Sequence, residues 1–224
     1  MKAAAVTLFA VALFASACSD FDLPSALSRE QILAVRATPP AIPAGERVLL
    51  DALLAGPSGR IGDADLSWTV PEGASAAIEL DAAGAPWLVA AAGAARGFLD
   101  VSLTATTPSG AELRAVKTIE IGAPRRENPT LARFEADGAS LLEGQTLAFA
   151  PGTAVALTAG LEPSLGESFA WYATIGEITR YRHNPTEIVI DDTQSGWLVV
   201  VGRDGEGGIT WAEVPMASAV SHAQ

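Results

Sequence analysis

The sequence predicts an all-β protein made of two antiparallel β-sandwich domains, and three observations support this fold class. Short apolar runs recur about every ten residues and are separated by Gly, Pro and Asp, a spacing typical of the strands of a sandwich. Helical periodicity is nearly absent. The pattern of the first half of the chain also recurs in the second half.

The first half contains about seven candidate strands, as a sandwich of this type requires. Residues 99–105 alternate most clearly: Leu99, Val101 and Leu103 are separated by polar residues, so one face is expected to be buried and the other solvated. The expected strands of this half are 31–37, 47–54, 66–70, 76–80, 86–90, 99–105 and 115–121.

Four runs of the second half correspond to strands of the first, and a closing strand follows the Asp204–Gly208 hairpin. Trp171 takes the place of Trp68, and both are expected in the domain cores together with Trp197. Trp87 and Trp211 are interpreted as either core residues or surface contacts. The expected strands are 131–135, 154–159, 169–174, 196–201 and 209–214.

The domain bounds follow from this repeat. We expect domain 1 at 29–122, a linker at 123–129, domain 2 at 130–217 and a flexible tail at 218–224. The linker contains two prolines and no apolar run, so neither sheet is expected to continue through it. Short linkers with proline are semi-rigid, which predicts that the two domains stack end to end as a stalk.

The N-terminus has the pattern of an export signal. Lys2 supplies a positive charge, and residues 3–17 are small or apolar apart from Thr7. The run is shorter than the roughly 20 residues that a membrane-spanning helix needs, and it fits the apolar part of a signal peptide. Residues 1–17 are therefore expected to be a removed signal peptide, and residues 18–28 a short tether.

Cys18 is the only cysteine in the chain, so no disulfide can stabilise the fold. An exported protein with a lone thiol leaves it open to oxidation unless it is modified. The segment Leu13-Phe14-Ala15-Ser16-Ala17-Cys18 resembles the lipobox of bacterial lipoproteins. That resemblance implies cleavage before Cys18 and acylation of its sulfur and its new amine, and three acyl chains give durable membrane attachment.

The lipobox departs from the family pattern at one place. Ala15 stands where these lipoproteins usually have Leu, and Ala15 with Ala17 also satisfies the rule for ordinary secretory cleavage, which is the alternative interpretation. Ser19 after the cysteine resembles the sorting pattern for the outer membrane of Gram-negative cells. Asp20 lies one place too late for the usual retention signal.

The charge of the chain limits its partners. The net charge of -12 argues against nucleic acid, whose phosphates require clustered Lys and Arg. It also argues against a protein that lies flat on an anionic membrane. The expected contacts are the membrane, through the N-terminal lipid, and an envelope protein or glycan.

The sequence offers no recognisable catalytic or cofactor site, so we expect no enzyme activity, no cofactor and no metal. His183 and His222 lack the further imidazole or thiolate that zinc needs. The Gly202–Gly208 stretch lacks the ending of a phosphate loop. Acidic turns at Asp63–Asp65, Asp191–Asp192 and Asp204–Glu206 are interpreted as solvated surface, because calcium needs about six or more converging oxygens.

One loop combines basic and aromatic residues in this acidic chain: Arg180, Tyr181, Arg182 and His183. One interpretation is a contact loop for an anionic glycan, lipopolysaccharide or an acidic partner, since Arg offers fork geometry and Tyr a stacking face. The other is a structural loop between opposite sheets, where these side chains lean on the edge of the sandwich.

Two parts of the chain carry a family resemblance. ILAVRATPPAIPAGERVLLDALLAGPSG (32–59) and FAWYATIGEI with GWLVVVGRDGEGGITW (169–178, 196–211) resemble immunoglobulin-like and PKD-like modules of bacterial surface lipoproteins, especially myxobacterial ones. The resemblance implies two tandem immunoglobulin-like sandwiches in a non-catalytic structural or protein-interaction module. The alternative is a glycan- or ligand-binding accessory lipoprotein that uses the Arg180–His183 loop.

The chain departs from antibody-type domains in two respects. It has no cysteine pair to link its sheets, and neither tyrosine lies where a tyrosine corner would be. We therefore expect Trp68 and Trp171 to be held by aliphatic packing alone.

Overall fold

A computed structural model describes residues 23–141, 144–191 and 193–219, and within these ranges the chain forms strands and turns without a helix. The predicted signal peptide, Cys18 and the last five residues lie outside the described residues. The strands of the first half are β1 (Gln31–Thr38), β2 (Ala41–Ile42), β3 (Arg47–Gly56), β4 (Gly59–Arg60), β5 (Asp65–Thr69), β6 (Ala76–Leu80), β7 (Pro86–Ala90), β8 (Gly97–Thr106) and β9 (Glu112–Ile121).

The second half also forms nine strands among the described residues, and eight of them follow the order of the first half. They are β10 (Thr130–Ala136), β11 (Ala139–Ser140), β12 (Leu147–Phe149), β13 (Ala154–Glu162), β14 (Ser168–Ala173), β15 (Glu177–Ile178), β16 (Thr186–Val189), β17 (Gly196–Arg203) and β18 (Ile209–Ser218).

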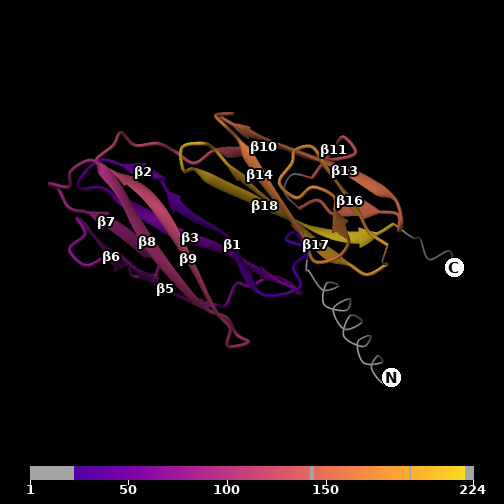
Figure 1. Cartoon of the computed structure of the whole chain (residues 1–224), viewed down its shortest axis with the longest axis horizontal. Helices are drawn as coiled ribbons and strands as arrows, with labels where there is room; N and C mark the ends of the chain where they lie inside the picture. The colour runs from indigo at the N-terminus through magenta and orange to yellow at the C-terminus, as the bar shows by residue number, and fades with distance from the viewer. Residues whose placement is uncertain (1–22, 142–143, 192, 220–224) are drawn as a thin grey trace, which may run out of the picture.

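The sheets show that the two halves repeat one topology. In the first half the sheets are β1-β3-β7-β6, with β4 beside β3, and β2-β9-β8-β5. In the second they are β11-β10-β13-β16-β15 and β12-β18-β17-β14. The short strands β2 and β12 each pair in parallel with the last strand of their half. This confirms the prediction of an all-β fold with two tandem immunoglobulin-like sandwiches (Figure 1).

The repeat extends to an irregularity in the first strand of each domain. The pairing of β1 with β3 shifts register between Ile32 and Ala34, and that of β10 with β13 shifts between Leu131 and Arg133. A shift of this kind turns the remaining side chains to the opposite face and bends the strand. Corresponding residues after the bulge therefore enter corresponding positions in the two cores.

Each sandwich has its own apolar core with a tryptophan in it. Trp68 is 8% exposed and Trp171 is fully buried, which confirms the prediction for both. Trp171 is held by more than aliphatic packing, contrary to expectation: its indole N–H donates to the His183 carbonyl at 2.9 Å, and its ring lies 5.9 Å from that of Phe134. The buried indole N–H of Trp68 has no such acceptor among the described residues, so the two tryptophans are held differently.

The prediction for Trp197 is wrong. This side chain is 37% exposed, because it projects from the outer face of β17. Its ring packs against Gly59, where a Cβ would lie only 2.5 Å from the ring. Gly59 also has φ of 96°, so it is suited to this place both by its conformation and by its lack of a side chain.

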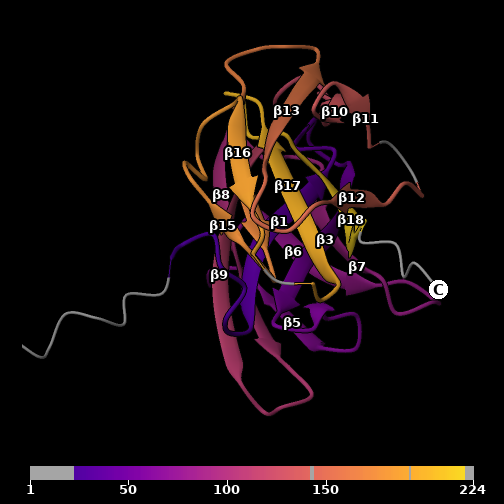
Figure 2. The ribbon, with the colours of Figure 1, turned by 90° about the vertical axis from the view of Figure 1, so that its right-hand side faces the viewer.

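The two domains share a third apolar cluster, which we call the seam core. It lies between β1 and β3 of domain 1 and β17 and β18 of domain 2, with Tyr172 and Trp211 packed against it. Its buried members are Leu27, Leu33, Ala34, Leu53, Ala55, Val199, Val201 and Ile209. Strand faces thus form this contact (Figures 1 and 2), and the predicted end-to-end stack is corrected accordingly.

The end of the predicted tether is part of the folded structure. Leu27 is 1% exposed in the seam core. Ala26 forms a parallel bridge with Ala173 at the free edge of β14, where Leu27 N donates to Ala173 O and Ala173 N donates to Ser25 O, both at 2.9 Å. The tether therefore leads to the junction of both domains, instead of acting as a spacer before the first.

Candidate functional site

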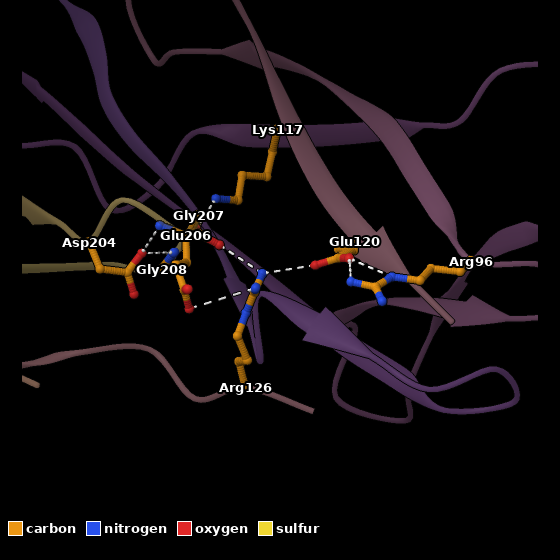
Figure 3. Close-up of polar contacts among 8 residues, drawn as sticks. All are labelled: Arg96, Lys117, Glu120, Arg126, Asp204, Glu206, Gly207 and Gly208. Carbon is orange, nitrogen blue, oxygen red and sulfur yellow. Dashed lines mark hydrogen bonds and ion pairs between the residues drawn. The ribbon is translucent and has the colours of Figure 1, made fainter. Parts of the chain in front are cut away.

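A group of charged residues closes one side of the domain junction, and we call it the polar seam. Lys117 and Glu120 come from β9, Arg96 directly precedes β8, and Arg126 lies in the linker. The fifth part is the hairpin of residues 204–208 between β17 and β18. Figure 3 shows that both domains contribute to this group.

Glu120 is the centre of the polar seam. Its Oε1 accepts from Nε and Nη2 of Arg96 at 3.0 and 2.8 Å, and its Oε2 pairs with Nη2 of Arg126 at 3.1 Å. Because the carboxylate is buried and both oxygens are engaged, it is not a free general base. Arg96 reaches this place because its backbone passes close to Gly122, where a Cβ would lie 2.8 Å away.

Arg126 connects the linker with domain 2. Its Nη2 donates to the Glu206 carbonyl at 2.8 Å, and its Nη1 lies 3.7 Å from the Glu206 carboxylate. Asp204 fixes the shape of the hairpin, because its Oδ1 accepts from the backbone N–H of Glu206 and of Gly208 at 2.9 and 2.7 Å. The hairpin thereby presents its carbonyls to domain 1.

Lys117 adds a buried cation to the polar seam. Its Nζ donates to the Gly207 carbonyl at 2.5 Å. Burial lowers the pKa of Lys117 to about 8; nearby Asp204 opposes this change and Arg203 adds to it. The ammonium therefore holds the two domains together by a charged hydrogen bond that is close to its titration range at mildly alkaline pH.

An open groove lies over the polar seam. It is lined by Pro40, Phe98, Thr118, Glu120, Arg126 and residues 205–207, from both domains. The Phe98 side chain at its rim is 77% exposed. An exposed aromatic ring beside partly satisfied guanidinium groups is typical of a protein contact surface, where aromatic residues and Arg are enriched.

Sequence reasoning missed Phe98, although the pattern contained a signal for it. Leu99, Val101 and Leu103 lie on the core-facing side of β8, so Phe98 lies on the solvent-facing side of the same strand. A single exposed apolar side chain serves no core, and it becomes a candidate contact only together with a neighbouring groove. The groove itself could not be predicted, because domain 2 provides one of its walls.

The predicted Arg180–His183 loop lies at another place, beside β14. Arg180, Arg182 and His183 are exposed, and Tyr181 is half-buried with the Arg182 guanidinium 5.2 Å from its ring centroid. Two backbone carbonyls of the loop bond to buried residues of domain 2. Tyr181 O accepts from Trp171 N at 2.8 Å, and Arg180 O accepts from the Thr186 hydroxyl at 3.0 Å. The backbone of this loop is structural, and its guanidinium groups stay accessible.

The acidic turns do not converge. Within the described residues no group of three or more His, Cys, Asp or Glu side chains is placed to hold a metal ion. The Asp204 carboxylate is used inside its own hairpin, Asp191 is exposed, and Asp192 lies outside the described residues. Cys18, the predicted lipid attachment site, also lies outside them.

A search of the described ranges for a membrane-crossing helix, long and apolar enough to span the bilayer, finds none.

No known protein family matches the sequence, and no curated protein sequence does either. Among solved structures, the tandem Ig repeats of Dlar are 12% identical with a TM-score of 0.32, covering 86% of this chain and 98% of that one. The fibronectin(III)-like modules of CbhA from Clostridium thermocellum are 14% identical with a TM-score of 0.32, covering 87% and 98%. The IG1 and IG2 domains of DIP-gamma are 11% identical with a TM-score of 0.28, covering 86% and 98%. These similarities concern the fold alone, which the strand order above defines.

Proposed function

We propose that this chain is a lipoprotein of the bacterial cell envelope, anchored in the outer membrane by acyl groups on Cys18, and that its two sandwiches act together as a non-catalytic protein-interaction module. The lipobox-like segment before Cys18 and the absence of any second cysteine support the anchor. Ser19 supports the outer-membrane location.

The observation that carries the interaction role is the groove over the polar seam. It exists only because the seam core and the polar seam hold the two domains in one arrangement. The carboxylate at its floor is neutralised by two arginines, and a bare phenylalanine stands at its rim. Such a surface is suited to bind a partner side chain and has no group free to act on a substrate.

The anchor is tested by labelling cells with radioactive palmitate and by mass spectrometry of the mature N-terminus. We expect label on the natural protein, none on the Cys18→Ser variant, and a first residue that is acylated Cys18. An unmodified chain that begins at Cys18 in the soluble fraction would contradict the anchor and support ordinary secretion.

The groove is tested by cross-linking in intact envelopes. Phe98→Asp is expected to abolish a specific cross-linked species that the natural protein forms. Leu80→Asp is the matched control, because Leu80 on β6 is also an exposed apolar residue, 69% exposed, and lies away from the groove. The same cross-links with both variants would remove Phe98 from the contact.

A second candidate function is supported by the accessible guanidinium groups of Arg180 and Arg182, which make no ion pair with any described residue. These groups suit an anionic ligand of an accessory lipoprotein, such as a glycan. A binding assay with envelope polysaccharide tests it: affinity that falls with Arg180→Gln and Arg182→Gln supports this role, and unchanged affinity excludes the loop.

A further inference from the structure

The tether and the Arg180–His183 loop lie side by side on one strand edge. Along the free edge of β14, Trp171 N donates to Tyr181 O and Ala173 N donates to Ser25 O. Two residues along a strand correspond to about 7 Å. The loop therefore borders the place at which the chain leaves the folded domains toward its N-terminus, and Figure 2 shows the first described residues, in indigo, beside domain 2.

The length of chain before this place is short. Four residues separate Cys18 from Leu23, the first described residue. Even a fully extended segment of this length spans only about 17 Å. If acyl groups on Cys18 lie in the bilayer, the free edge of β14 must stay close to the headgroups.

The Arg180–His183 loop is basic, whereas the chain as a whole is acidic. The chain carries a net charge of -12, whereas the loop presents two exposed guanidinium groups. Glu177 and Glu187, on the neighbouring strands β15 and β16, form no ion pair with them among the described residues. An anionic surface attracts these two guanidinium groups, whereas it repels the net negative charge of the chain.

The side chains next to this edge also suit an interface. The half-buried Tyr181 ring carries the Arg182 guanidinium above it, and Leu23 is an exposed apolar residue at the start of the described chain. Tyrosine and arginine with apolar stems are typical of the headgroup level of a membrane, because their polar ends stay hydrated.

We propose that Arg180 and Arg182 contact the anionic headgroups of the membrane that holds the anchor, and so turn the edge of β14 toward the bilayer. This inference rests on the proposed lipid attachment at Cys18. Each basic residue close to an anionic surface strengthens attachment about fivefold. The groove at Phe98 contains none of these loop residues, and it is then free to face a partner.

The experiment uses the lone thiol of the chain. The protein from Cys18 to Gln224, with every described residue, is coupled through Cys18 to a maleimide lipid in nanodiscs that contain a gadolinium lipid. Amide NMR signals are recorded with and without anionic lipid. We expect residues 179–183 to lose severalfold more intensity than residues 82–84, in the turn between β6 and β7, and the loss to grow when anionic lipid is present.

The charge dependence decides the proposal. Arg180→Gln with Arg182→Gln is expected to remove the effect of anionic lipid, whereas Arg47→Gln, an exposed arginine of β3 beside Trp87 in domain 1, is expected to leave it unchanged. Equal profiles in both lipids, or a profile that the double variant does not alter, would overturn the proposal and assign the arginines to another ligand. Since coupling at Cys18 is chemical here, native acylation is judged separately by mass spectrometry of the cellular protein.

Discussion

The guanidinium of Arg36 lies over the indole ring of Trp211, with its central carbon 4.0 Å from the ring centroid. Arg36 belongs to β1 and Trp211 to β18, so this cation–π pair connects the two domains. Arg36 is oriented from its own domain by Asp51, whose Oδ2 accepts from Nη2 at 2.7 Å. Asp51 of domain 1 orients Arg36 toward the Trp211 ring of domain 2. The pair therefore favours one relative placement of the two domains.

Trp211→Ala is therefore expected to weaken the domain junction. Loss of the ring and of the cation–π pair should lower the free energy of unfolding by about 2–3 kcal/mol. Urea unfolding followed by circular dichroism measures this change. Trp87→Ala is the matched control. The central guanidinium carbon of Arg47 lies 4.2 Å from the Trp87 ring centroid, and both residues belong to domain 1. Calorimetry should resolve two transitions for Trp211→Ala and one for Trp87→Ala; a single transition for both would show that the domains stay coupled without the Trp211 ring.

Leu27→Ala is expected to release the tether from the edge of β14. Leu27 is almost fully buried, so its truncation should cost about 2–4 kcal/mol of stability. Hydrogen exchange at the Leu27 and Ala173 amides should accelerate, because these two groups form the tether bonds. Leu80→Ala, at an exposed position, should change stability by no more than about 0.5 kcal/mol. Unchanged protection of Ala173 in Leu27→Ala would show that the side chain does not hold the tether.

Lys117 predicts a pH dependence of stability. Its pKa is about 8 in the folded chain against 10.5 for an ordinary lysine, so between these values the unfolded state binds more protons. The free energy of unfolding should therefore rise with pH in this window, by at most about 1.4 kcal/mol per pH unit. Below pH 8 the full cost of the buried charge is present.

The measurement is urea unfolding from pH 7.5 to 10. The Lys117→Met variant should lack the rise, because it has no ammonium to titrate. Lys117→Arg keeps a donor for Gly207 and does not titrate in this range, so it should also give a flat profile. A rise of equal slope in all three proteins would place the titrating group elsewhere.

Asn128 predicts a strong effect of one linker residue. Its Nδ2 donates to Ala37 O at 2.8 Å, and its Oδ1 accepts from Ile209 N at 2.9 Å, so one amide joins both domains. Asn128→Ala should cost about 1–3 kcal/mol, since it leaves backbone groups at the junction without partners. Asn184 binds Ala159 N and O inside domain 2. Asn184→Ala should lower the free energy of unfolding by as much, but its two domains should still unfold in one calorimetric transition. If both variants uncoupled the domains equally, the proposed role of Asn128 at the junction would be contradicted.

The sequence predicted the two sandwiches because local alternation and turn residues encode them. Val101 and Leu103 mark a buried face of β8, and Trp68 and Trp171 enter the cores as expected. The placement of the two sandwiches was predicted as an end-to-end stack, whereas strand faces of the two domains meet. It depends on which outer faces meet, and the proline-containing linker alone does not determine this.

One signal for the junction was nevertheless present. The run Val199-Val200-Val201 on β17 does not alternate, and Leu53-Leu54-Ala55 on β3 does not either. Strands that are buried on both faces have such continuous apolar runs. In the structure Val200 and Leu54 lie in the domain cores, while their neighbours face the other domain in the seam core.

The bridge between Ala26 and Ala173 has a mechanical consequence. Tension on the N-terminus would act first on the few backbone bonds that hold this segment, before any load reached the sandwiches. Once residues 23–27 were peeled from β14, the chain would lengthen by at most about 17 Å while both sandwiches stayed folded. The two sandwiches would then lie at either of two distances from the attachment point: a shorter one with the N-terminal segment bound to β14, and a longer one with that segment extended.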